Sequence, residues 1–311
     1  MASRRSPSPP PAASRAGRVA LVGRPNVGKS TLLNGLVGEH LTIVSHHPQT
    51  TRERVAGVVN DGPLQMVLVD TPGQHTAKNR LGQRMNQEVA DAMAGADVIV
   101  LVSDVTETPT PTLPALDAAI AASAPPGKPV ILVVSKIDRV KIKGDLLPVL
   151  AGRAAAFPFA AVVPLSAKKR DGLERLKQEI ASRLPDGERL LDEEAISDRP
   201  SRFFVREYVR EQVLRRTRQE VPHGVAVTID RWEESPKLTR IDVTVHVDKE
   251  SHKKIVLGER GLLMKDIGTR ARERAEALLG QKIMLKIWVR VTPRWYESDK
   301  LLAEFGYGDE G

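Results

Sequence analysis

Short apolar runs alternate with amphipathic stretches through the first 184 residues of the chain. Five of these runs read as buried strands: Val19 to Val22, Gln65 to Val69, Val98 to Val102, Val130 to Val134, and Ala161 to Leu165. Strands separated by helices form parallel sheets, and the helices then cover the faces of the sheet. The pattern predicts an α/β domain over residues 18–184, with a mostly parallel sheet and helices on both faces.

The pattern changes after residue 184. Residues 185–200 are polar, acidic and bounded by prolines, which predicts a linker. Beyond them come a helical pattern, two alternating strands, a helical stretch interrupted at residues 258–261, and a last strand: Phe203 to Arg218, Ala226 to Trp232, Thr239 to Val247, and Lys282 to Val291. The order α-β-β-α-α-β predicts an α+β domain over residues 201–295, followed by a C-terminal tail, residues 296–311.

Composition and charge narrow the class of protein. The chain has no cysteine, which excludes disulfides and thiolate metal sites and fits a reducing compartment. Residues 1–17 are rich in proline, arginine and serine, and consecutive prolines favour a disordered tail over a transit peptide. The net charge is +8, and residues 199–300 carry all of it, with 23 lysines and arginines against 15 acids. The second domain is therefore expected either to bind a polyanion (RNA, DNA or an anionic membrane) or to present an ordinary solvated basic surface.

A phosphate-binding loop lies between the first strand and a helix. Gly23-x-x-x-x-Gly28-Lys29-Ser30 matches the P-loop pattern in full. Its glycines allow backbone N–H groups to face phosphate, Lys29 neutralises phosphate oxygens, and the Ser30 hydroxyl binds Mg²⁺. The predicted loop contacts are Gly23, Arg24, Pro25, Asn26, Val27, Gly28, Lys29, Ser30 and Thr31.

Four further motifs follow in the order typical of GTPases, and the chain resembles the translation-factor-like GTPases. They are Thr50-Thr51, Asp70-Thr71-Pro72-Gly73, Ser135-Lys136-Ile137-Asp138, and Ser166-Ala167-Lys168. The resemblance implies that Thr51 and, through water, Asp70 hold Mg²⁺, and that Gly73 senses the γ-phosphate. It also implies that Asp138 and Ala167 read guanine. Relatives usually carry asparagine at Ser135, and a serine is expected to reach less far toward the loop and the base.

Two residues bear on hydrolysis in addition to Lys29. Gln74 occupies the position at which Ras-like GTPases carry a water-orienting glutamine and Era-like GTPases a hydrophobic residue. It either orients water or merely sits in a mobile switch. Asn26 resembles the asparagine that other GTPases with this loop associate with a potassium ion; its alternative role is hydrogen bonding within the loop.

The second domain resembles a type II KH domain. Gly258-x-x-Gly261 lies between two helical segments, as in the loop with which KH domains clamp about four nucleotides. The predicted RNA contacts are Lys253, Lys254, Gly258, Glu259, Arg260, Gly261 and Lys265. Five aromatics near the end of the chain are expected to serve as core or domain-docking residues rather than to stack on RNA: Trp288, Trp295, Tyr296, Phe305 and Tyr307.

Together these motifs resemble the Era family of bacterial ribosome-assembly GTPases from Arg18 to about Trp295. The resemblance implies a GTPase with Mg²⁺, GTP or GDP and a potassium ion as ligands. It also implies binding of 16S ribosomal RNA near its 3′ end, action in maturation of the 30S subunit, and a cytoplasmic protein with some peripheral contact to the inner face of the cell membrane. We expect a monomer that does not bind DNA. The alternative is an RNA-binding adaptor with a weakly active nucleotide pocket. A tRNA-modification GTPase is disfavoured, because that family carries a C-terminal cysteine.

Overall fold

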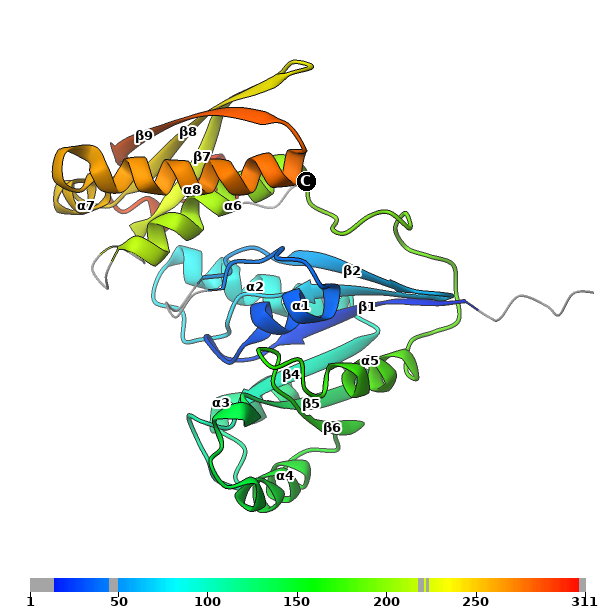
Figure 1. The fold of residues 1–311 in the computed structure, drawn as a ribbon. Coiled ribbons are helices and arrows are strands. Elements are labelled where there is room, and N and C mark those ends of the chain that lie inside the picture. Colours follow the sequence, from blue (N-terminus) through cyan, green and yellow to red (C-terminus); the bar gives the residue numbers. More distant parts are fainter. Residues whose placement is uncertain (1–13, 45–49, 218–220, 222–223, 308–311) are drawn as a thin grey trace, which may run out of the picture.

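The computed structural model describes residues 14–44, 50–217, 221 and 224–307, and these form two domains joined by a packed connection (Figure 1). The first domain contains a six-stranded sheet of order β2-β3-β1-β4-β5-β6, in which only β2 is antiparallel to its neighbour. Its strands are β1 (Arg15–Val22), β2 (Val55–Asp61), β3 (Leu64–Asp70), β4 (Val98–Asp104), β5 (Val130–Ser135) and β6 (Ala161–Pro164).

Helices cover both faces of this sheet, as predicted. They are α1 (Lys29–Val37), α2 (Arg80–Ala94), α3 (Ala115–Ala122), α4 (Leu146–Ala154) and α5 (Leu173–Ala181). Alternate residues of β1 enter different cores: Val19 and Leu21 pack with α1 and α5, whereas Ala20 and Val22 pack with α2, α3 and α4. This division follows from the two-residue period of a strand, and it fixes the carboxyl end of β1 between two packed layers.

Strand β2 departs from the sequence-based expectation. It pairs antiparallel with β3 across a turn made by Gly62 and Pro63, and Gly62 has a left-handed φ of 56°. The alternation of strands and helices does not predict this hairpin, because no helix lies between β2 and β3. The first strand also begins earlier than expected, since Arg15 to Gly17 pair with β3. Of the predicted tail, residues 1–13 lie outside the described residues.

The second domain has the predicted order of elements. It contains α6 (Ser201–Arg216), β7 (Ala226–Glu234), β8 (Leu238–Val247), α7 (Glu250–Leu257), α8 (Leu262–Leu279) and β9 (Lys282–Val291). The sheet order is β7-β8-β9, with β7 antiparallel and β9 parallel to β8. The predicted helix ends at Arg216, and Arg218 lies outside the described residues. No helix of the described chain is long and apolar enough to cross a membrane.

The predicted linker, residues 185–200, lies along the β2–β3 edge of the first sheet (Figure 1). The backbone N–H of Val58 donates to the Ile196 carbonyl over 3.1 Å. The Gln65 side chain accepts from the N–H groups of Leu190 and Leu191 over 2.7 and 2.9 Å. The connection therefore covers a strand edge that would otherwise present unpaired backbone groups.

The predicted C-terminal tail is ordered as far as residue 307. Residues Trp295–Glu297 form a short 3-10 turn, and α9 (Asp299–Glu304) follows it. Trp295, Phe305 and Tyr307 are buried in one cluster with Leu81 and Met85 of α2. These aromatics thus dock the second domain on the first, which is one of the two predicted roles. Trp288 does not join them, since 62% of it is exposed. Residues 308–311 lie outside the described residues.

Candidate nucleotide and RNA sites

The turn between β1 and α1 depends on residues that adopt positive φ. Gly23, Asn26 and Gly28 have φ values of 144°, 63° and 107°. A Cβ on Gly23 would lie 2.4 Å from the Val102 carbonyl oxygen, so only glycine fits there. Loops of this kind at the N-terminus of a helix form anion-binding nests from their backbone N–H groups, which predicts such a nest at the start of α1.

Lys29 is held at the centre of this nest. Its Nζ donates to the carbonyl oxygens of Gly23 and Arg24 over 3.0 and 2.9 Å. Burial lowers the pKa of the ammonium to about 8, because desolvation disfavours the charged form. The two carbonyl oxygens carry only partial negative charge, whereas a bound phosphate would supply a full counter-charge to the Lys29 ammonium. The Arg24 side chain turns away instead and bonds Asp117 and Glu107, both over 2.8 Å, so that its backbone alone faces the loop.

The three predicted Mg²⁺ ligands converge from three separate segments. The Ser30 hydroxyl donates to Asp70 Oδ2 over 2.7 Å, and the Thr51 hydroxyl lies 3.2 Å from the same oxygen and 3.0 Å from Ser30 Oγ. Burial raises the Asp70 pKa to about 6, and its other oxygen, Oδ1, is buried without a hydrogen-bond partner in the described residues. Two hydroxyls and one underused carboxylate fit a hard cation such as Mg²⁺.

The segment after Asp70 packs directly on the P-loop. The Thr71 hydroxyl donates to the Leu21 carbonyl over 2.7 Å, and the Gln74 N–H donates to the Gly23 carbonyl over 3.2 Å. A Cβ on Gly73 would lie 2.6 Å from the backbone of Pro25, so this position requires glycine. Gly73 lines the cavity described below, whereas the side chain of Gln74 does not.

The guanine motif also contacts the P-loop. The Ser135 hydroxyl donates to the Val27 carbonyl over 2.7 Å, so this serine contacts the loop. Lys136 Nζ donates to the Asn26 carbonyl over 2.7 Å and pairs with the buried Asp104 over 2.5 Å. Asp104 was missed from the sequence, although the carboxyl end of β4 lies beside that of β5.

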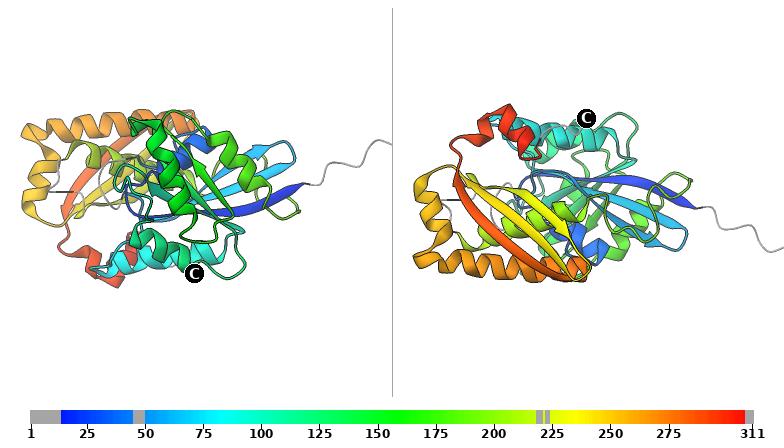
Figure 2. Two further views of the ribbon diagram at one scale, coloured as in Figure 1. Left: turned by 90° about the horizontal axis from the view of Figure 1, so that it is seen from below. Right: turned by 90° about the horizontal axis from the view of Figure 1, so that it is seen from above.

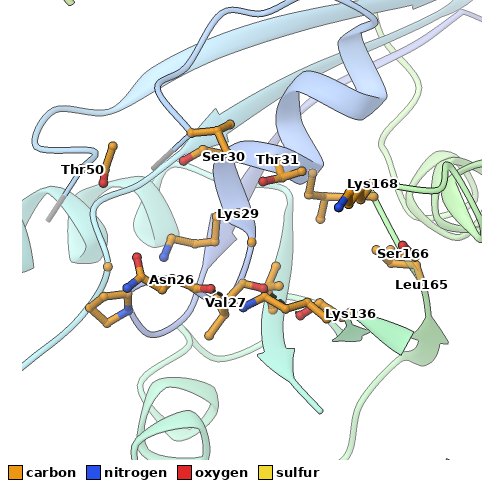
Figure 3. A pocket seen from close by; sticks show the side chains of 18 of the residues that line it. Asn26, Val27, Lys29, Ser30, Thr31, Thr50, Lys136, Leu165, Ser166 and Lys168 are labelled. Carbon is orange, nitrogen blue, oxygen red and sulfur yellow. Dashed lines mark hydrogen bonds between the residues drawn. The ribbon is translucent and has the colours of Figure 1, made fainter. Parts of the chain in front are cut away.

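A cavity of about 510 Å³ joins the phosphate and guanine motifs (Figure 3). Ser166 donates from its hydroxyl to Asp138 Oδ1 over 2.6 Å, which orients the carboxylate at the cavity wall. Predicted residues that line the cavity are Pro25, Asn26, Val27, Gly28, Lys29, Ser30, Thr31, Thr51, Gly73, Ser135, Lys136, Asp138, Ser166, Ala167 and Lys168. Predicted residues that do not line it are Gly23, Arg24, Asp70, Thr71, Pro72, Gln74 and Ile137.

The GxxG loop lies between α7 and α8, where the sequence predicts it. Gly258 has φ 70° and ψ −178°, a conformation open to glycine alone, and a Cβ there would lie 2.5 Å from that of Leu263. Gly261 has φ 77° and open space on its Cβ side. Four predicted RNA contacts make no ion pair with any described residue: Lys253, Lys254, Arg260 and Lys265. Their charge remains available to phosphates.

Arginines link the second domain to the segment that holds Thr51. Arg210 of α6 donates to the Thr50 carbonyl, and Arg206 of the same helix pairs with Glu53. In the opposite direction, Arg52 donates to the Val225 carbonyl over 2.5 Å and lies 5.4 Å from the ring centre of Trp295. No sequence motif predicts these contacts, because each joins residues about 100 or more positions apart.

Similarity to known proteins extends over both domains. The family described as "50S ribosome-binding GTPase" matches residues 18–136, and "KH domain" matches residues 220–296. GTPase Era of Trichlorobacter lovleyi is 40% identical over 94% of this chain and 98% of its own length. GTPase Era of Pseudomonas aeruginosa is 40% identical over 96% and 97% of the two chains, and that of Stenotrophomonas maltophilia is 42% identical over 94% and 97%.

Two solved structures match nearly the whole chain with a TM-score of 0.90 and 38% sequence identity. One is Era in complex with MgGDPNP and nucleotides 1506–1542 of 16S ribosomal RNA; the match covers 95% of this chain and 99% of that one. The other is an Aquifex aeolicus Era variant bound to GDP and AlF4⁻, and the match covers 94% and 99% of the two chains.

Proposed function

The chain belongs to the Era family of GTPases, and we propose that its GTP cycle controls the binding of 16S ribosomal RNA by its KH domain during maturation of the 30S subunit. The related Era that is 38% identical was solved with MgGDPNP and a 16S ribosomal RNA segment, which supports both ligands. The observation that carries the control step is the set of arginine contacts between α6 and the Thr50–Glu53 segment.

These contacts join the Mg²⁺ site to the RNA domain through adjacent residues. Thr51 bonds Asp70, while its neighbours on both sides bond the second domain: Thr50 through Arg210, and Arg52 through Val225. Movement of Thr51 when the γ-phosphate is lost would therefore strain contacts to α6 and to the aromatic cluster. We propose that this strain changes the position of the KH domain relative to the GTPase domain.

In this proposal the residues of the chain position the phosphates and the attacking water. Lys29 exchanges its two carbonyl partners for phosphate oxygens, and the loop N–H groups stabilise the charge that develops during transfer. Ser30, Thr51 and, through water, Asp70 hold Mg²⁺, which neutralises the β- and γ-oxygens when bound. Asp138, oriented by Ser166, accepts hydrogen bonds from guanine.

We propose that Gln74 orients the attacking water. Its Oε1 is buried and accepts no hydrogen bond from the described residues, and Gly73 beside it lines the cavity. Gln74→Ala should lower the single-turnover rate by at least about tenfold, because the water loses its acceptor. Rapid-quench measurement with excess protein tests this, with Gln87→Ala of α2 as the matched control. A rate equal to that of the parent would leave Gln74 only its backbone contact to Gly23.

We also propose that Asn26 supports a potassium ion beside the phosphates. Asn26 lines the cavity next to Lys29 (Figure 3). Replacing K⁺ with Na⁺ at constant ionic strength should lower GTP turnover by about tenfold or more, because a site sized for K⁺ holds the smaller Na⁺ weakly and the transition state then lacks a positive charge. Asn26→Gly suits φ 63° without strain and should remove the difference between the two salts. Equal turnover of the parent in K⁺ and Na⁺ would contradict the proposal.

The proposed function is tested by crosslinking and sequencing of bound RNA under GTP and under GDP. We expect reads to gather near the 3′ end of 16S ribosomal RNA and to differ between the two nucleotides. Crosslinks outside ribosomal RNA would overturn the assembly role while leaving the GTPase intact. Turnover measured with and without RNA separates the GTPase from the alternative adaptor, for which we expect no hydrolysis in either condition.

We also propose that the protein makes peripheral contact with the inner face of the cell membrane. The excess of basic residues in the second domain supports it, because anionic headgroups attract lysine and arginine. Cosedimentation with anionic and with neutral vesicles tests it: equal binding to both would argue against an electrostatic contact.

A further inference from the structure

The sheet of the KH domain has an outer face that its own helices leave open. Along β9 the side chains alternate: Leu285, Ile287 and Val289 pack against the core beneath α6 and α8, while the residues between them face outward. The outward set is Met284, Lys286, Trp288 and Arg290, all of them exposed. Seen from above, the strands lie in front of the helices and away from the GTPase domain (Figure 2, right). We call this surface, completed by Arg240 and Thr244 of β8, the Trp288 face.

Trp288 is the most unusual residue of this face. Its exposed fraction is 62%, against 0% for Trp295, and Met284 on the same face of β9 is 42% exposed. The strand register places Thr244 opposite Trp288, so a small side chain leaves the indole uncovered. Exposure of so large an apolar ring has no stabilising role in the folded monomer, and it favours contact with a ligand.

The charge around Trp288 favours an anionic ligand. Lys286 and Arg290 lie two residues away on either side, and Arg240 lies opposite Met284 on β8. None of these three cations forms an ion pair with a described residue. Three acids lie on the same face. Asp242 lies opposite Lys286, Glu233 lies opposite Arg240 and pairs with Arg231, and Asp230 accepts from Thr228 and Thr244. An exposed aromatic ring flanked by cations that form no ion pair is the arrangement with which proteins bind single-stranded nucleic acid.

The position of β9 connects this face to the GxxG loop. Strand β9 is the edge strand of the sheet, and both α7 and α8, which carry the loop between them, pack against it. A strand of RNA that leaves the loop across this edge therefore meets Trp288 next. The GxxG loop clamps only about four nucleotides, whereas the related Era was solved with the much longer segment 1506–1542. A segment of that length extends well beyond the nucleotides that the loop clamps.

We propose that the Trp288 face is a second RNA-binding site, which receives single-stranded RNA leaving the GxxG loop across the edge of β9. One base stacks on the indole of Trp288, and the adjacent phosphates pair with Lys286, Arg290 and Arg240. The site is tolerant of sequence, because stacking and phosphate contacts recognise features that all nucleotides share. This inference rests on the proposed function, in that the KH domain must bind RNA.

The test compares a long RNA with a short one on the full-length protein. The long RNA is the 1506–1542 segment, and the short RNA is whichever pentamer from a tiled set of that segment binds most tightly. Trp288→Ala should weaken binding of the long RNA by about tenfold and leave the pentamer unchanged. Trp288→Phe should restore most of the affinity, since it keeps an aromatic face. The double variant Lys286→Glu with Arg290→Glu should weaken binding of the long RNA further and reduce the salt dependence of that binding. Lys143→Glu in the GTPase domain is the control for the change in charge.

Unchanged GTP turnover without RNA shows that the GTPase domain of every variant folds, and unchanged binding of the pentamer shows that the KH domain of Trp288→Ala folds. Quenching of tryptophan fluorescence by the long RNA should fall in Trp288→Phe, although Trp232 and Trp295 remain. The inference is overturned if Trp288→Ala binds the long RNA as the parent does, or if it weakens both RNAs equally; the proposed function survives either result. A parent protein that binds neither RNA would instead overturn the proposed function itself.

Discussion

Asp138→Asn should weaken GTP binding by about three orders of magnitude or more and transfer the preference of the site to XTP. In the proposed site the carboxylate accepts from both N1–H and the exocyclic amine of guanine, whereas an asparagine keeps one acceptor but turns a donor toward the amine. A site built to hydrogen-bond a base edge discriminates by about 10⁴ once a buried partner is lost. Xanthine carries a carbonyl where guanine carries the amine, so it matches the asparagine. Isothermal titration with GTP and with XTP measures both effects.

The structure makes this a specific test of base recognition. The substituted asparagine would retain an oxygen for the Ser166 hydroxyl, which now donates to Asp138 Oδ1 over 2.6 Å, so the side chain should keep its position. Asp145→Asn, on an exposed 3-10 turn of the same domain, controls for the change in net charge. If Asp138→Asn bound GTP as tightly as the parent and XTP no better, guanine would have to be recognised by other groups.

The nucleotide site could be predicted from the sequence because its chemistry depends on local backbone geometry. Gly23 and Gly28 are required by their own φ values, and Gly23 also by the close approach of the Val102 carbonyl oxygen. Because these constraints act within one short loop, they appear in the sequence as glycines at a fixed spacing. The motifs that begin at Asp70, Ser135 and Ser166 lie at the carboxyl ends of β3, β5 and β6, which meet at one edge of the sheet, so their order in the chain predicts that they converge. Thr51 lies instead in the segment before β2. Ser30, Thr51 and Asp70 do converge, within 3.2 Å of one another.

The contacts between the domains could not be predicted in this way. Arg52, Arg206 and Arg210 look like ordinary solvated residues in the sequence, and they acquire partners only when α6 packs beside the Thr50–Glu53 segment. Nothing local distinguishes a buried arginine from an exposed one. The same limit applies to Trp288: aromatic composition grouped it with Trp295, but the two-residue period of β9 turns it to the opposite side from the core.

Substitution of Gly261 in the GxxG loop by aspartate should weaken RNA binding by about a hundredfold. The two glycines differ in what they tolerate. Any side chain at Gly258 would clash with Leu263, whereas a Cβ at Gly261 meets open space, and aspartate and asparagine accept left-handed φ better than other residues do. Gly261→Asp therefore keeps the fold and places a carboxylate where a phosphate approaches. Repulsion between the new carboxylate and an approaching phosphate should cost about 2.8 kcal/mol of binding free energy, which corresponds to the hundredfold loss.

Gly261→Asn is the matched control, because it has the same shape and backbone preference without the charge. We expect it to weaken binding much less than Gly261→Asp does, and we expect the gap between the two variants to narrow as salt screens the repulsion. Filter binding of the 1506–1542 segment at two salt concentrations measures this. Equal losses for both variants would mean that the side chain obstructs RNA by its size. Equal affinity of both variants and the parent would place the RNA elsewhere on the domain, because the phosphate backbone would then not approach Gly261.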